Sequence, residues 1–210
     1  WPGDSRRNMR PVAAGQGRHP HWQSLYQDDN WRRLPWFADA LEPTIEQYLQ
    51  EHPLTGTCLD LGCGDGTQAA RMAERGFTVT GVDIAPGAIR AAQRFAEPQL
   101  TFICRDALTL RPAKPYDIVI DRGFLHVLPL HDRIRYVELL RAATRPSGLV
   151  LLNCFSSDEP DPGFGPERFS RPGVEQLLGR AFRVEEHFQF RWTGPLQARP
   201  LTHFFAIRRV

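Results

Sequence analysis

Two apolar segments, one ending in a glycine-rich turn and one in a carboxylate, constrain the fold of this chain most strongly. The first segment, Cys58–Leu61, runs into closely spaced glycines and then into a helical pattern over 67–75. The second segment ends at Asp83, about twenty residues further on. Glycines permit a tight turn and a close backbone approach to a ligand, and a carboxylate at this place can accept hydrogen bonds from both ribose hydroxyls. The pattern therefore predicts a nucleotide-binding βαβ unit. The glycines of the turn are Gly62, Gly64 and Gly66.

The spacing of the glycines separates two classes of nucleotide cofactor. It is G-x-G-x-G, whereas the dinucleotide fingerprint is G-x-G-x-x-G. The segment Asp60-Leu-Gly-Cys-Gly-Asp-Gly66, together with Asp83, resembles motif I of the class I S-adenosyl-L-methionine (SAM) methyltransferases. The resemblance implies SAM as cofactor and S-adenosyl-L-homocysteine (SAH) as product. A tight strand-to-helix turn in some other α/β protein remains the alternative.

Strand-like and helix-like segments alternate after residue 56, which predicts an α/β fold with a parallel sheet and helices on both faces. The last two apolar runs lack a helix between them and suit a terminal hairpin. The resemblance implies a Rossmann-like, seven-stranded, mostly parallel sheet with an antiparallel last strand. The predicted strands are Thr57–Leu61, Phe77–Val82, Leu100–Cys104, Tyr116–Asp121, Leu149–Phe155, Phe182–Arg191 and Leu201–Arg208. The predicted helices include 68–74, 86–95, 132–143 and 172–178, and a short Pro-Gly turn is expected at 145–148.

Composition predicts a single enzyme domain over 21–210, preceded by a flexible arm over 1–20 in which Met9 could be the natural start. A net charge of +2 without a basic block disfavours nucleic acid. No apolar run reaches the ~20 residues that span a bilayer. The four cysteines form no C-x-x-C pair, so we expect reduced thiols, no metal and a cytoplasmic protein. We further expect a monomer or homodimer that acts on a small molecule.

The resemblance also assigns the residues that bind the cofactor. The glycine turn would hold the amino-acid part of SAM and Asp83 the ribose, and Asp60 of the same motif is a further cofactor-binding residue. Ile84 would pack against the adenine, while Asp106 and Ala107, after the third strand, would read its polar edge. For Asp106 the alternative is an exposed aspartate of a turn.

An aromatic segment before the first strand has two interpretations. Pro35-Trp36 resembles the amino-terminal segment of the thiopurine/thiol methyltransferase branch, which lies over the SAM site. Trp31 and Trp36 are therefore candidates to cover the methionine end, where a sulfonium can sit over an aromatic face. Packing into the core is the alternative for both, and it is the preferred interpretation for Trp22 and Tyr26.

The fourth strand ends in Asp121-Arg-Gly-Phe-Leu-His126, where class I enzymes place the reacting methyl group. Asp-Arg-Gly resembles the thiopurine S-methyltransferase group, which implies roles for Asp121 at the cofactor and in catalysis. Arg122 could hold an acceptor carboxylate bidentately or favour a thiolate. His126 could act as a general base, although a lone histidine in a turn is more often structural.

These features predict methyl transfer from SAM to a small-molecule thiol. The alternatives are an oxygen or nitrogen acceptor, for which His126 would matter more, and a SAM-binding protein without catalysis. Residues 156–171 are rich in proline, glycine and charge and follow the fifth strand. They are expected to form either a lid over the ligand edge of the sheet or a solvated connector.

Overall fold

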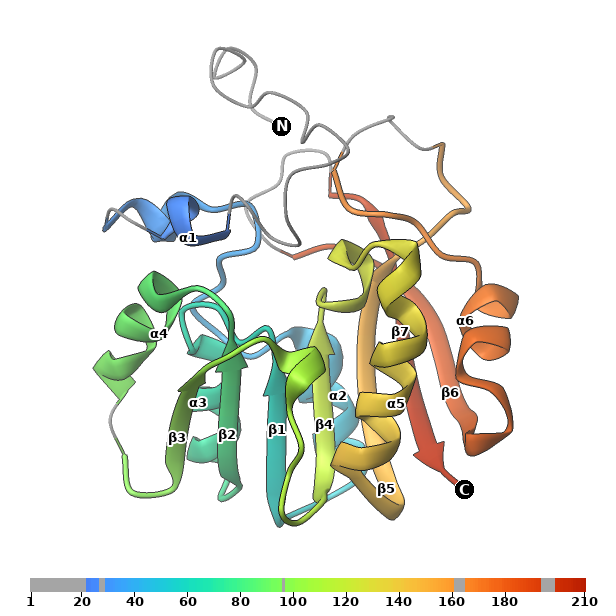
Figure 1. Cartoon of the computed structure of the whole chain (residues 1–210). Coiled ribbons are helices and arrows are strands. Elements are labelled where there is room, and N and C mark those ends of the chain that lie inside the picture. The colour runs from blue at the N-terminus through green and yellow to red at the C-terminus, as the bar shows by residue number, and fades with distance from the viewer. Residues whose placement is uncertain (1–21, 27–28, 96, 161–164, 194–198) are drawn as a thin grey trace.

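The computed structural model describes residues 22–26, 29–95, 97–160, 165–193 and 199–210, so the arm expected over 1–20 lies outside the described residues. One seven-stranded sheet with the order β3-β2-β1-β4-β5-β7-β6 forms the centre (Figure 1). Strands β1 to β5 are parallel, and β7 runs antiparallel to both of its neighbours. The predicted fold class is therefore confirmed. The strands are β1 Thr57–Leu61, β2 Thr78–Asp83, β3 Leu100–Cys104, β4 Tyr116–Arg122, β5 Thr144–Phe155, β6 Phe182–Arg191 and β7 Leu201–Arg209.

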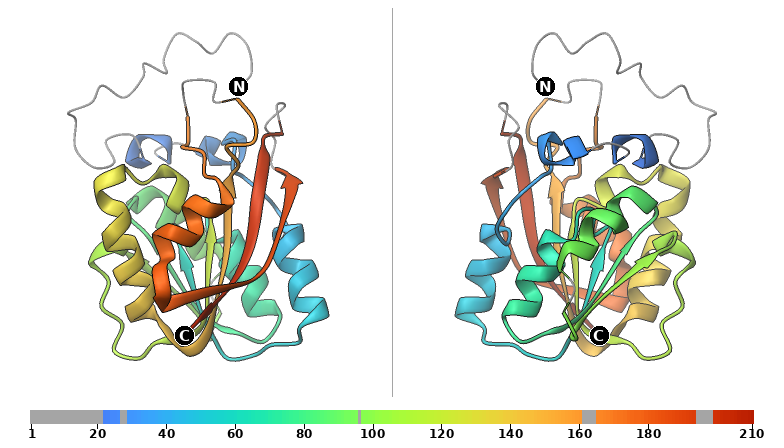
Figure 2. Two further views of the ribbon diagram at one scale, coloured as in Figure 1. Left: turned by 90° about the vertical axis from the view of Figure 1, so that its right-hand side faces the viewer. Right: turned by 90° about the vertical axis from the view of Figure 1, so that its left-hand side faces the viewer.

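Helices cover both faces of the sheet, with α2 and α3 on one side and α5 and α6 on the other (Figure 2). Proline opens α2 and α4, where its fixed φ suits the first turn. In the described part of the chain, every helix is too short or too polar to cross a bilayer. The α-helices are α1 Trp22–Leu25, α2 Pro43–Glu51, α3 Thr67–Glu74, α4 Pro86–Ala92, α5 Arg133–Ala143 and α6 Arg171–Leu178. Short 3-10 turns are η1 Asp29–Arg33, η2 Gln93–Phe95, η3 Ala107–Thr109, η4 Leu125–Val127, η5 Leu130–Asp132 and η6 Gly179–Ala181.

Two differences from the predicted elements exceed a shift of one residue. The helix expected over 86–95 is α-helical only to Ala92 and closes as η2. The turn expected at 145–148 is instead a bulge inside β5, opposite Asp117 of β4. Ser147 there has φ 58°, and the Arg145 side chain donates to the Asp117 carboxylate at 2.6 Å. The bulge lets β5 begin earlier than its apolar run.

Alternation along the central strands divides the core into two layers. Val119 of β4 packs towards α5 and α6, whereas Ile118 and Ile120 pack towards α2 and α3. Both faces are buried, as expected of a parallel sheet covered by helices. The carboxyl ends of β1, β2, β3 and β4 therefore meet at one edge of the sheet, the edge that α1 overhangs in Figure 1.

Candidate active site

The turn after β1 has the backbone that its glycines predict. Gly62, Gly64 and Gly66 have φ values of 65°, 53° and 80°, in the left-handed region that favours glycine. A Cβ on Gly66 would lie 2.6 Å from the Cβ of Ala92 in α4. The Cys63 N–H donates to the Val82 carbonyl at 3.0 Å and fastens the turn to β2. The turn is thus a close-packed backbone cradle at the ligand edge.

Asp83 ends β2 and braces this turn directly. Its carboxylate accepts from the N–H of Gly64 at 3.0 Å and from the N–H of Ala85 at 2.8 Å. Burial raises the pKa of Asp83, although these backbone bonds partly offset the shift. A carboxylate offers about four acceptor sites, so capacity remains for ribose hydroxyls. That role stays a prediction, and the bracing of the turn is an addition that the sequence did not indicate.

Asp60 carries a buried acceptor without a donor. The backbone of Ala69 in α3 hydrogen-bonds to this carboxylate, but within the described residues its Oδ2 has no partner. Burial, and then the nearby Asp83 and Asp121, raise the pKa of Asp60 to about 8. An ammonium group at this place would supply the missing donor and favour the ionised carboxylate. The cradle and this acceptor together fit the amino-acid end of SAM.

The residues predicted to read adenine lie beside Asp83. The Arg105 N–H donates to the Asp83 carbonyl at 2.9 Å, which joins the ends of β2 and β3. Asp106 caps η3 by accepting from the Leu108 N–H at 3.0 Å. Ala107 is buried next to it, and Ile84 is half-buried at the end of β2. The capping agrees with the alternative of a turn aspartate, and the adenine role of these residues stays a prediction.

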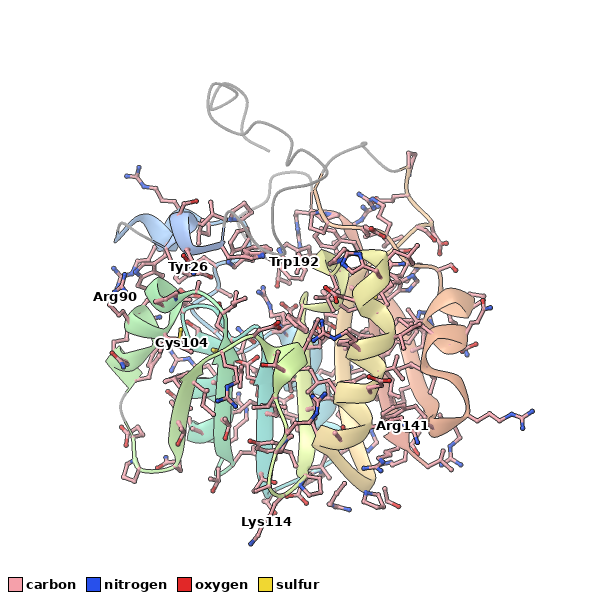
Figure 3. All side chains as sticks on the ribbon, viewed as in Figure 1. Tyr26, Arg90, Cys104, Lys114, Arg141 and Trp192 are labelled. Atoms are coloured by element: carbon pink, nitrogen blue, oxygen red, sulfur yellow. The ribbon has the colours of Figure 1, made fainter. Side chains whose placement is uncertain are left out.

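Tyr26 lies against the glycine turn and was not among the predicted site residues. It is buried, as expected of core packing, but a Cβ on Gly64 would lie only 2.8 Å from its hydroxyl. Burial, followed by the charge of Asp83, raises its pKa. Figure 3 shows Tyr26 above the carboxyl edge of the sheet. No local pattern marks it, because the tyrosine and the glycine turn meet only in the tertiary fold.

The two tryptophans of the aromatic segment differ in their surroundings. The Trp31 ring has the guanidinium groups of Arg32 and Arg94 over it, at 4.4 and 4.2 Å from its centre. The Trp31 ring therefore already contacts two cationic side chains of the protein. This favours packing into the core over a contact with the sulfonium of SAM. Trp36 donates its indole N–H to the Tyr26 hydroxyl at 2.9 Å. It thus lies between the glycine turn and the end of β4, where covering the cofactor remains a prediction.

The side chains of Asp121 and His126 both make hydrogen bonds to neighbouring parts of the fold. The buried Asp121 carboxylate accepts from the Phe124 N–H at 2.6 Å and from the Tyr136 hydroxyl at 2.8 Å, while burial raises its pKa to about 6. His126 Nδ1 accepts from the Phe155 N–H at 3.3 Å, so Nε2 carries the ring proton. Burial and the charge of Arg122 lower the pKa of His126 to about 3. This disagrees with a general base and favours the structural alternative.

Arg122 meets partners that the sequence interpretation did not single out. Its Nε donates to Glu42 at 2.7 Å, and its Nη1 donates to the Trp36 carbonyl at 2.8 Å. The guanidinium carbon lies 4.2 Å from the centre of the Trp192 ring. Glu42 already accepts from Nε. This side of the guanidinium is therefore not available to hold an acceptor carboxylate bidentately, as the sequence had suggested. Glu42 and Trp192 lie far from Arg122 in sequence, so no local spacing could have found them.

One group of possible metal ligands exists among the described residues. Glu51, His52 and Glu186 bring their ligand atoms within 4.8 Å of one another, and His52 pairs with Glu186 at 2.8 Å. The group lies at the opposite end of α2 from Glu42. It lies away from the glycine turn and is partly exposed, and the expectation of a metal-free active site remains a prediction.

Comparison with known proteins supports the cofactor and the reaction. A family described as a methyltransferase domain matches residues 58–148. A 2-heptyl-1-hydroxyquinolin-4(1H)-one methyltransferase of Mycobacteroides abscessus is 29% identical over 160 residues, covering 73% of this chain and 70% of that protein. A thiopurine S-methyltransferase of Aliivibrio salmonicida is 31% identical over 139 residues, covering 59% and 61%.

Solved structures share the fold across nearly the whole chain. A protein studied for the conversion of a disulfide bond into a thioacetal group during echinomycin biosynthesis has a TM-score of 0.73, 24% identity and coverage of 90% and 93%. The Burkholderia thailandensis 1,6-didemethyltoxoflavin-N1-methyltransferase, with its substrate and SAH bound, has a TM-score of 0.70, 24% identity and coverage of 95% and 93%.

The fold and the site are those of a nucleotide-binding α/β protein, and the comparisons identify the class of enzyme more closely. The chain is a SAM-dependent methyltransferase with the Rossmann-like methyltransferase fold. The thiopurine relative is distant, at 31% identity over 59% of this chain, and does not place the chain in the thiopurine branch.

Proposed function

We propose that this enzyme transfers the methyl group of SAM to a small-molecule thiol. The observation that carries the proposal is the lack of a spare base around Arg122. Within the described residues there, Glu42, Asp121 and His126 are all held in hydrogen bonds. A thiol ionises at a pKa of about 8.5 and is a strong nucleophile once ionised. It therefore needs no base from the protein.

SAM supplies an electrophilic methyl group, and the protein has to bind, orient and exclude water. The glycine turn, Asp60 and Asp83 are positioned to hold the cofactor, with Tyr26 above the turn. Arg122 marks the acceptor side at the end of β4. Such a site accelerates transfer mainly by proximity and orientation.

The relatives support a small-molecule acceptor. They suggest two candidates for the atom that receives the methyl group, sulfur and oxygen. The thiopurine enzyme, and the protein studied for the conversion of a disulfide bond into a thioacetal group, support sulfur as the acceptor atom. The quinolone relative supports a hydroxyl on a heterocycle as the second candidate. An acidic hydroxyl would suit the same site, because it also ionises without a protein base.

An acceptor panel tests the proposal. Thiophenol, phenol, aniline and 2-heptyl-1-hydroxyquinolin-4(1H)-one are incubated with SAM, and SAH formation is measured from pH 6 to 9. We expect the highest kcat/KM with the thiol, rising with the fraction of thiolate. His126→Asn should leave thiol turnover within about two-fold, because no general base is lost.

His131→Asn, at an exposed position, is the matched control. SAM affinity and the melting temperature of each variant separate a folding defect from a chemical one. A strong preference for aniline or phenol, with His126 essential, would replace sulfur by nitrogen or oxygen as the acceptor.

A further inference from the structure

Two buried N–H donors lie together at the end of β4 without an acceptor among the described residues. They are Nη2 of Arg122 and Nε1 of Trp192. The Arg122 side chain is 7% exposed and Trp192 is 2% exposed. Figure 3 places Trp192, like Tyr26, at the carboxyl edge of the sheet. A buried donor without a partner costs free energy in the free protein, so its retention calls for a reason.

The surrounding contacts hold both donors in place. Glu42 accepts from Arg122 Nε at 2.7 Å and from the Thr193 hydroxyl at 3.0 Å, so it connects β4 to the segment after β6. Gln68 of α3 in turn accepts from the Glu42 N–H at 2.8 Å. The Trp192 ring lies under the guanidinium and meets Phe155 edge-on, with ring centres 5.5 Å apart. The donors are therefore fixed by four separate chain segments.

The charge of the cluster restricts what these donors can bind. Glu42 is fully buried and cancels the charge of Arg122 at salt-bridge distance. A carboxylate brought to Nη2 would lie near the Glu42 carboxylate in a place that water does not screen, and like charges repel strongly there. An uncharged oxygen, such as an amide or ring carbonyl, would accept from either donor without that penalty.

We propose that Arg122 Nη2 and Trp192 Nε1 form a two-donor subsite for an uncharged carbonyl-type oxygen of the methyl acceptor. Glu42 is a positioning residue that holds the guanidinium and excludes acceptors bearing a carboxylate. The subsite deepens the proposed function and rests on it, since it assumes that the acceptor lies beside the end of β4. It assigns the substrate class as small thiols or heterocycles with a neutral oxygen near the reacting atom.

Three matched acceptors test the subsite: thiophenol, 2-mercaptobenzamide and 2-mercaptobenzoate. The wild-type enzyme should prefer the amide to the other two by about five-fold or more in kcat/KM, the usual effect of one or two hydrogen bonds. Trp192→Phe keeps an aromatic ring, although a smaller one, and removes the donor. It should remove most of the preference for the amide, measured as the ratio of kcat/KM for the amide to kcat/KM for thiophenol. Arg145→Lys, at the exposed pair with Asp117 on the opposite edge, is the control and should not change this ratio.

One further measurement does not depend on turnover. Calorimetry with the SAH-bound protein should show benzamide binding more tightly than benzoate. Glu42→Gln should reverse this order, because it frees the positive charge of Arg122.

The outcomes separate this subsite from the proposed function. If none of the thiols is methylated, sulfur fails as the acceptor, yet the benzamide and benzoate measurements still decide on the subsite. If thiols are methylated but Trp192→Phe affects amide and thiophenol equally, the subsite is refuted and the proposed function stands. Tighter binding of benzoate than of benzamide by the wild-type protein would also refute it.

Discussion

Buried carboxylates give the ligand edge its chemical character at the scale of single residues. Asp60, Asp83 and Asp121 lie at the ends of three adjacent strands, and burial raises the pKa of each. Asp121 compensates its burial by accepting from the Tyr136 hydroxyl and from backbone N–H groups. Among the residues that the structure describes, Asp60 has no such partner at Oδ2. Asp60 therefore holds a proton in the free enzyme at neutral pH, and a cationic ligand beside it would favour its ionised form.

We predict that Asp60 couples stability and SAM binding to pH. An unfolded aspartate has a pKa of about 3.9, whereas burial raises that of Asp60 to about 8. Between these values the folded free protein binds the extra proton, so the free energy of unfolding should fall as pH rises from about 4 to about 8. Subtracting the profile of Asp60→Asn from that of the wild type, in urea unfolding, isolates this contribution.

The same carboxyl should lose its proton when the ammonium of SAM arrives. Calorimetry at pH 7 in buffers of different ionisation enthalpy should detect proton release with the wild type and less with Asp60→Asn. Equal release by both proteins would remove Asp60 from the SAM site.

A second residue-scale prediction concerns Asp83. Asp83→Ala removes the acceptor expected for the ribose hydroxyls and also releases the Gly64 N–H. Each buried group left unpaired costs about 1–3 kcal/mol, so SAM affinity should fall by about ten-fold or more. Calorimetry measures the affinity, and circular dichroism checks the fold. Asp83→Asn, which keeps the shape and one acceptor, should fall in between, while unchanged affinity in both variants would contradict the assignment.

At the scale of elements, the aromatic segment before α2 acts as a cap on the ligand edge. Helix α1 lies over α4 in Figure 1, and Tyr26 reaches from its end to the glycine turn. A Cβ on Gly87 of α4 would lie 2.3 Å from the Tyr26 carbonyl. The close approach of α1 and α4 thus requires a residue without a side chain at position 87. The requirement is steric and not conformational, because the backbone of Gly87 is helical.

We predict that Gly87→Ala displaces the cap and weakens SAM binding. Overpacking of this kind costs about 1–3 kcal/mol, which corresponds to about ten-fold in affinity. Tryptophan fluorescence should change when SAH binds the wild type and change less in the variant. Limited proteolysis should cleave the 22–37 segment faster in the variant.

Gly173→Ala, in α6 on the far face, is the matched control, because its added Cβ would meet only the Ser170 hydroxyl at 3.1 Å. The cap would have no role in SAM binding if Gly87→Ala left affinity and fluorescence unchanged.

At the scale of the whole molecule, the terminal hairpin fastens the segment that follows β5. His203 of β7 donates from Nε2 to the Phe169 carbonyl at 2.9 Å, because a carbonyl can only accept. Its Nδ1 then accepts from His187 of β6 at 2.8 Å. The part of the 156–171 loop that the structure describes is thus tied to the sheet, and whether it acts as a lid stays a prediction.

We predict that this histidine pair makes the fold sensitive to acid. Burial lowers the pKa of both rings, whereas an unfolded histidine has a pKa of about 6.5. The unfolded chain therefore takes up protons first as pH falls, and the free energy of unfolding should decrease below about pH 6.5. His187→Phe, which can still stack on Phe205, should lose less stability between pH 7 and 5.

Urea unfolding at each pH measures the effect, and the difference between variant and wild type cancels the opposite slope from Asp60. The exposed variant His131→Asn should follow the wild type. If the free energy of unfolding depended on pH in the same way for His187→Phe and the wild type, the histidine pair would make no contribution to the acid sensitivity.

The sequence by itself determined the fold class, the order of the strands along the chain and the cofactor turn. These features are local: the left-handed φ values at 62, 64 and 66 and the burial of β1 follow from residue types and their spacing. The element boundaries were less well determined at the bulge in β5, because its position depends on pairing with β4.

Only the tertiary structure decided what surrounds the end of β4. Arg122 could be placed there from the sequence, but Glu42, Trp192 and Thr193 reach it from distant segments. The protonation of His126 likewise depends on its burial and on the Phe155 N–H. Charge balance, tautomer and unpaired donors are properties of contacts between segments, and a linear pattern of residues carries no record of such contacts.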